Sequence, residues 1–135
     1  MVLTADAPST CFGCGPAHPS GLRLKFELSG HGAMVAEWVP SLEWQGYRGV
    51  IHGGIVSTVL DEAMAKSAAV FSSRGVTAEL KVRFRRPVEP GQRLAIRAWA
   101  VEVSKRRILT EAVIIGADGP EYAHAWGTFL APRAE

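Results

Sequence analysis

One stretch of the chain, which begins at Gly53, repeats its apolar residues with the period of an α-helix, whereas the segments on both sides alternate with the period of a β-strand. On a helical wheel, one stripe of this stretch consists of Val56, Val59, Leu60, Ala63, Ser67 and Val70. Ser72, Ser73 and Gly75 end the pattern. A single helix of about 20 residues has one apolar stripe to bury, so the strands must provide the surface that covers it.

The segments that show strand patterns lie on both sides of this helix, two before it and four after it. In chain order they are residues 22–29, 34–39, 76–84, 93–104, 106–117 and 123–131. The first of them alternates clearly, with one face formed by Leu22, Leu24, Phe26 and Leu28. The sequence "ADGP" predicts a hairpin turn between the last two.

This order of elements predicts an α+β fold in which a curled antiparallel sheet wraps around one long central helix. We predict a single domain over residues 22–131, preceded by an irregular segment over residues 1–21 that is rich in proline and glycine. Because one helix cannot cover both faces of such a sheet, we expect another copy of the chain to cover the remaining surface or an edge.

Composition narrows the class of protein. The chain has 135 residues, of which 47% are hydrophobic, and 15 basic against 13 acidic residues give a net charge of +2. A charge this close to balance argues against a nucleic-acid partner. The start of the chain lacks the features of a secretory leader, and no run approaches the roughly 18 apolar residues of a membrane span. We therefore expect a cytoplasmic protein with reduced cysteines and no membrane partner.

The start of the predicted helix carries a histidine and a glycine pair, His52, Gly53 and Gly54. The first N–H groups of a helix have no partner within the helix, and these donors favour a negatively charged ligand. Glycine lets a ligand oxygen approach the backbone closely. These residues are therefore candidates for an oxyanion hole around an acyl carbonyl. The alternative is an ordinary glycine-rich helix start with no role in binding, which has the same sequence pattern.

Asp61 lacks a basic partner at helical spacing. The positions three and four residues away are occupied by Ser57, Thr58, Met64 and Ala65. Glu62, in contrast, has Lys66 four residues later, which is the favoured spacing for a helical salt bridge. Because a carboxylate among small residues is expected to be partly desolvated, Asp61 is the candidate general base or nucleophile.

Helix geometry keeps these two candidate groups apart. Gly54 and Asp61 are seven residues apart in the chain, which corresponds to about 10.5 Å along a helix axis. A reacting carbonyl has to lie within about 3 Å of each group that acts on it. If both residues act in one site, Asp61 must therefore come from a second subunit, and a two-fold dimer would form two such sites.

The segment "QGYRGVIHGGIVSTVLDEAM" resembles the helix-start signature of the PaaI-like hotdog-fold acyl-CoA thioesterases, a family of the 4-hydroxybenzoyl-CoA thioesterase superfamily. In that signature an aspartate follows the histidine of "HGG" by nine residues. "CFGCGPAHPSGLRLKF", "FRRPVEPGQRL" and "TFLA" resemble further segments of the family, so the likeness extends from about Cys11 to Leu130. The resemblance implies a hotdog fold, homodimers or homotetramers, and hydrolysis of acyl-CoA to a free acid and CoA. It implies no cofactor, because CoA is part of the substrate.

The resemblance also implies roles for single residues. The Gly54 N–H, with Gly53 beside it, would polarise the thioester carbonyl. His52 would orient the loop or contact the thioester. Asp61 of the neighbouring subunit would act as nucleophile or general base, and Thr77, sixteen residues later, would position water.

Further candidates lie before and after the helix. Several family members have Asn or Gln six or seven residues before the histidine, where this chain has Gln45 followed by Gly46. The candidates for binding the phosphates of CoA are Arg86, which precedes a proline as in the family, and then Arg85, Arg83 and Arg106. Taken singly, each of these arginines is more typical of a solvated strand residue.

Cys11 and Cys14 have the spacing of half a zinc site, with His18 as a third ligand. A structural zinc ion takes four ligands, and this segment offers three. We therefore predict no metal and two reduced thiols in a loop.

Two other functions fit a hotdog fold. A non-catalytic acyl-CoA sensor would not require an acid at position 61. A hotdog hydratase or dehydratase would use an aspartate ahead of the helix, and no aspartate lies between Glu37 and Asp61.

Overall fold

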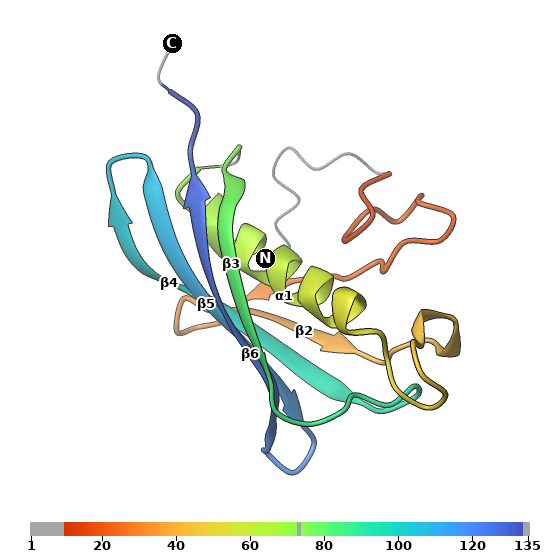
Figure 1. The fold of residues 1–135 in the computed structure, drawn as a ribbon. Coiled ribbons are helices and arrows are strands. Elements are labelled where there is room, and N and C mark those ends of the chain that lie inside the picture. The colour runs from red at the N-terminus through yellow and green to blue at the C-terminus, as the bar shows by residue number, and fades with distance from the viewer. Residues whose placement is uncertain (1–9, 73, 134–135) are drawn as a thin grey trace.

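A computed structural model describes residues 10–72 and 74–133 and confirms the predicted α+β hotdog architecture (Figure 1). The elements in chain order are β1 (Glu27–Leu28), β2 (Met34–Trp38), a 3-10 turn η1 (Leu42–Trp44), α1 (Gly53–Ala69), β3 (Val76–Phe84), β4 (Leu94–Ser104), β5 (Arg107–Gly116) and β6 (Glu121–Leu130). The six strands form one antiparallel sheet in the order β1-β2-β4-β5-β6-β3. The sheet curls around α1, which lies in its concave side (Figure 1).

The helix is held by its apolar stripe. Val56, Val59, Leu60 and Ala63 are all buried, as the helical period predicts. Met64 packs against Gly127 of β6, where an added Cβ atom would lie 3.0 Å from the Met64 sulfur. A side chain at position 127 would therefore force the Met64 side chain to shift. The stripe ends earlier than predicted, because Val70 caps the helix and is 47% exposed.

The first strand is much shorter than the predicted segment 22–29. Leu24 and Phe26 are buried, so the predicted alternation is correct. However, only Glu27 and Leu28 pair with β2. The preceding chain bonds to the N-terminal segment instead, because the N–H groups of Leu22 and Leu24 donate to the carbonyls of residues 12 and 13 at 2.8 and 3.0 Å. Backbone pairing, which side-chain alternation does not report, decided the length of this strand.

Strand β3 forms an open edge of the sheet. It has the predicted bounds and pairs with β6 alone. A β-bulge between Thr77 and Glu79 interrupts the predicted alternation, so Thr77, and not Val76, faces the helix together with Leu80 and Phe84. The apolar residues Val76, Leu80 and Phe84 are 66, 38 and 54% exposed, so nothing in the described part of the chain covers them.

No helix in residues 10–72 and 74–133 is long and apolar enough to cross a membrane.

The helix–sheet contact should dominate stability. Leu60 is fully buried, so replacing Leu60 with alanine should lower the free energy of unfolding by about 2–5 kcal/mol through lost burial and a residual cavity. The exposed Val70 gives a matched control, because Val70→Ala should change that free energy by no more than about 0.5 kcal/mol. Urea unfolding of both variants measures the difference, and equal losses would mean that α1 is not anchored by this stripe.

Candidate active site

The loop before α1 positions His52 at the helix N-terminus. Gln45 and Ile51 form an isolated antiparallel bridge, and the N–H of His52 donates to the carbonyl of Trp44 at 2.9 Å. The side chain of Gln45 braces the same loop, since its Oε1 accepts the N–H of Gly49 at 3.1 Å. Gly49 has φ +82°, a left-handed conformation that favours glycine. The loop is therefore closed by its own hydrogen bonds before the helix begins.

His52 caps the helix with its side chain. Its Nδ1 accepts the N–H of Gly54 at 2.9 Å, so a neutral ring carries its proton on Nε2. The N–H of Gly53 has no hydrogen-bond partner among the residues that the structure describes. The glycine pair thus presents one available donor and one donor held by the histidine, where the sequence predicted two available donors.

A shallow cavity of about 430 Å³ opens over this helix start. Trp44, Gln45, His52, Gly54 and Thr58 are among its lining residues. The structure therefore brings together three of the predicted site residues, which lie on the loop and on the first turn of α1. Tyr47, by contrast, is 89% exposed and does not line this cavity.

Asp61 lies two turns further along α1 and is paired with Thr77. The hydroxyl of Thr77, on β3, donates to Asp61 Oδ1 at 2.8 Å. Asp61 is half-buried, and Thr77 is exposed. Asp61 does not line the cavity that contains Gly54. The two groups are thus separate within one chain, as the axial distance along the helix predicts.

A second cavity of about 330 Å³ lies on the other side of the helix start. Gly53, Phe84, Arg85 and Arg86 are among its lining residues. Two of the four predicted phosphate-binding arginines therefore stand beside the glycine pair. Arg83 and Arg106 do not line it. Arg106 lies in the turn between β4 and β5, at the far end of the sheet, where Arg107 faces Leu130.

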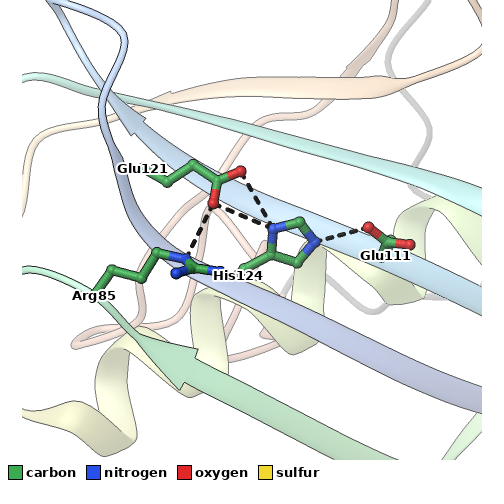
Figure 2. A network of polar contacts seen from close by, with 4 residues as sticks. All are labelled: Arg85, Glu111, Glu121 and His124. Carbon is green, nitrogen blue, oxygen red and sulfur yellow. Dashed lines mark hydrogen bonds and ion pairs between the residues drawn. The ribbon is translucent and has the colours of Figure 1, made fainter.

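A charged network on β5 and β6 was not predicted from the sequence. His124 lies between two carboxylates, with Nε2 2.7 Å from Glu111 and Nδ1 3.3 Å from Glu121 (Figure 2). Arg85 completes the network through its Nε, 3.2 Å from Glu121 (Figure 2). The spacing of Glu121 and His124 was visible in the sequence, but Glu111 reaches the ring only through the register of β5 with β6. The ion pair with Glu121 holds the guanidinium group of Arg85, whereas Arg86 forms no ion pair within the described residues.

A family model described as the thioesterase superfamily matches residues 48–123, which is more than half of the chain. The chain belongs to the thioesterase superfamily. The matched region begins in the loop before His52 and includes α1 with Asp61, strands β3 to β5 and the first residues of β6.

A Schizosaccharomyces pombe protein described as uncharacterised is 32% identical over 114 residues, which cover 78% of this chain and 63% of the relative. The chain thus spans less than two thirds of that relative.

Solved structures share the fold. A thioesterase superfamily protein superposes with a TM-score of 0.84 at 25% identity, over 90% of this chain and 60% of that one. A mutant of the phenylacetic acid degradation protein PaaI from Thermus thermophilus gives a TM-score of 0.74 at 24% identity, over 82% and 95% of the two chains. A hypothetical thioesterase solved with coenzyme A, from Streptococcus pneumoniae, gives 0.70 at 20% identity, over 81% and 85%.

The cap formed by His52 makes a testable contribution to stability. His52→Ala removes the acceptor of the Gly54 N–H and should lower the free energy of unfolding by about 0.5–2 kcal/mol. His52→Asn should retain most of that stability, because asparagine is a preferred N-cap residue. Thermal and urea unfolding of the two variants should therefore rank them wild type, Asn, Ala. Equal stability of all three would show that the hydrogen bond adds nothing.

Proposed function

We propose that this protein hydrolyses an acyl-CoA thioester to a free acid and CoA. The observation that carries this proposal is the arrangement on α1 of a chain that belongs to the thioesterase superfamily. A glycine pair with backbone donors begins the helix, and a half-buried acid paired with a threonine hydroxyl follows two turns later.

In the proposed reaction the helix start polarises the thioester. The N–H of Gly53 and the N–H of Gly54 would donate to the carbonyl oxygen as it gains negative charge during attack, the role of an oxyanion hole. Because Nδ1 of His52 accepts the Gly54 N–H in the absence of substrate, the imidazole has to share or release that hydrogen when the carbonyl enters. His52 and the substrate carbonyl would therefore compete for the same N–H group of Gly54.

Asp61 would supply the other half of the chemistry. Acting as general base, it would take a proton from water as the water oxygen attacks the thioester carbon. Acting as nucleophile, it would attack that carbon itself and form a mixed anhydride, which water then hydrolyses to the free acid and the restored carboxylate. In both cases the carbon–sulfur bond breaks, and CoA leaves as a thiolate that takes up a proton. The hydroxyl of Thr77, which donates to Oδ1, holds the carboxylate in one orientation. The second carboxylate oxygen of Asp61, Oδ2, would then be the one that meets water or substrate.

We propose further that the site is shared between two subunits of a homodimer. Support comes from β3, an edge strand whose apolar residues Val76, Leu80 and Phe84 are exposed on an unpaired edge. Such an edge is typical of a strand that pairs with another chain. Thr77, and with it Asp61, lies at this edge, so a partner joined here would receive the acid. A further pairing into tetramers is a prediction of the family resemblance alone.

The CoA moiety would lie along the second cavity. Arg86 and Arg85 line it together with Gly53, and their guanidinium groups are suited to binding the phosphates of CoA. A neighbour of the same fold was solved with coenzyme A. The proposal requires no cofactor and no nucleic-acid partner, and it places the protein in the cytoplasm, where the free thiols of Cys11 and Cys14 would stay reduced.

The alternative is a non-catalytic acyl-CoA sensor. One observation favours it: the donor that an acyl carbonyl requires, the Gly54 N–H, is already bonded to His52. The pair of Asp61 and Thr77 favours the enzyme, because a binder requires no oriented carboxylate.

The enzyme hypothesis predicts a strong effect at position 61. Asp61→Asn should reduce turnover at least about 10²-fold, the contribution of one acid–base group, while the hydrogen bond from Thr77 and the fold are kept. Asp118→Asn makes the same chemical change on an exposed turn and should leave turnover unaltered. The measurement is free-thiol release from a panel of acyl-CoAs. Activity retained in Asp61→Asn would remove this residue from the mechanism, and binding without release in the wild type would favour the sensor.

A shared site predicts complementation. Gly54→Pro removes the backbone donor, and Asp61→Asn removes the acid, so each homodimer should be inactive. Mixed subunits should recover some activity, because a heterodimer contains one site with both groups intact. The two proteins would be co-expressed with different tags and the heterodimer purified before assay. No recovery in a verified heterodimer would place both groups of each site in one subunit.

A further inference from the structure

The N-terminal segment brings two thiols onto the middle of α1. The Sγ atoms of Cys11 and Cys14 and a carboxylate oxygen of Glu62 all lie within 4.8 Å of one another. The cysteines precede β1, whereas Glu62 projects from the helix. Figure 1 shows this segment, coloured red to orange, on the side of α1 that the sheet leaves uncovered.

We propose that Cys11, Cys14 and Glu62 bind a zinc ion that fastens the N-terminal segment to α1. Zinc binds thiolate sulfur at about 2.3 Å and carboxylate oxygen at about 2.0–2.2 Å, so its tetrahedral ligands lie about 3.5–3.8 Å apart. A contraction of at most about 1.3 Å would bring the three atoms to that spacing. With Glu62 in place of His18 the site again has three protein ligands, so a water molecule would have to complete the tetrahedron. The proposal is independent of the thioesterase function.

The backbone already holds the thiols in place. The N–H of Gly15 donates to the carbonyl of Cys11 at 2.8 Å, which turns the chain so that the second cysteine returns beside the first. Gly13 lies directly against the acid: a Cβ atom at this position would be 2.5 Å from Oε2 of Glu62. Only glycine permits this approach. The two cysteines are therefore brought together by a local turn, and the packing of Gly13 against α1 places them beside Glu62.

Charge balance favours a divalent cation at this position. Lys66 lies 3.8 Å from Glu62, and the two side chains are only 6 and 17% exposed. The salt bridge predicted from their spacing is therefore confirmed, but it is buried beneath the N-terminal segment and is not a solvated surface pair. Two thiolates and one carboxylate carry three negative charges, which a zinc ion and the Lys66 ammonium neutralise together. A hydrogen bond from Lys66 to Cys14 would add the outer support that metal-bound thiolates usually have.

His18, the third ligand offered by the sequence, is turned away from this cluster. Its Nδ1 accepts the N–H of Ser20 at 3.1 Å, and its ring packs edge-on against Phe12 with centroids 5.3 Å apart. The helix provides Glu62 instead. Because the proposed site uses Glu62 and not His18, replacing each of these residues separately tests the proposal.

The test is titration of metal-stripped, reduced full-length protein with Co²⁺, followed by displacement with Zn²⁺. The wild type should bind one equivalent per chain, with thiolate-to-cobalt charge-transfer absorption that one equivalent of Zn²⁺ abolishes. Glu62→Gln should weaken Co²⁺ binding at least about tenfold, whereas His18→Ala should leave the dissociation constant unchanged. Cys11→Ser and Cys14→Ser should each diminish the charge-transfer band.

Three outcomes would overturn the proposal. They are no charge-transfer band in the wild type, equal binding by Glu62→Gln and wild type, and a Cys11–Cys14 disulfide that forms in air as readily with Zn²⁺ as without it. Circular dichroism of each variant checks its fold. Because a cysteine variant can fail to fold, a further measurement uses the wild type alone: Zn²⁺ should slow alkylation of both thiols and raise the melting temperature, and unchanged alkylation would equally refute the site.

Discussion

The burial of a single helix inside one curled sheet is the interaction on which the rest of this structure depends. The stripe around Leu60 and Ala63 meets the inner faces of the strands, and Gly127 allows Met64 to approach β6 closely. Once the stripe is buried, the rotation of α1 is determined. Every other side chain on the helix then has a defined neighbour, and the chemistry of the protein follows from which neighbour each one has.

The helix start shows how a stable fold and a reactive site compete for the same groups. Unpaired N–H donors make a helix N-terminus suitable for an anion, yet they also require a cap when no ligand is present. His52 provides that cap by accepting the Gly54 N–H. The imidazole is held there because the preceding loop is closed by the bridge between Gln45 and Ile51. In the proposed reaction a substrate carbonyl would replace this hydrogen bond, which would limit the net gain from binding and make the histidine part of recognition.

Two adjacent acids on α1 have different surroundings because successive helical residues point about 100° apart. Asp61 faces the open edge of the sheet, where Thr77 donates to it. Glu62 faces the N-terminal segment, where it meets Lys66 and the cysteine pair. The same helix thus has one face directed toward the open edge of the sheet and another covered by its own chain. Sequence spacing separated the two acids correctly, but it described Glu62 only through its salt bridge.

The sequence by itself determined the elements and the family. Alternation placed β3 within its correct bounds, and the spacing from His52 to Asp61 indicated the superfamily that the family model confirms. These features are local, because periodicity and spacing act over a few residues. Tertiary structure alone decided which distant groups meet: the length of β1, the pairing of His124 with Glu111, and the approach of Glu62 to Cys11. Those contacts depend on strand register and on the rotation of α1, which are set by packing the whole core and are encoded in no single segment of the chain.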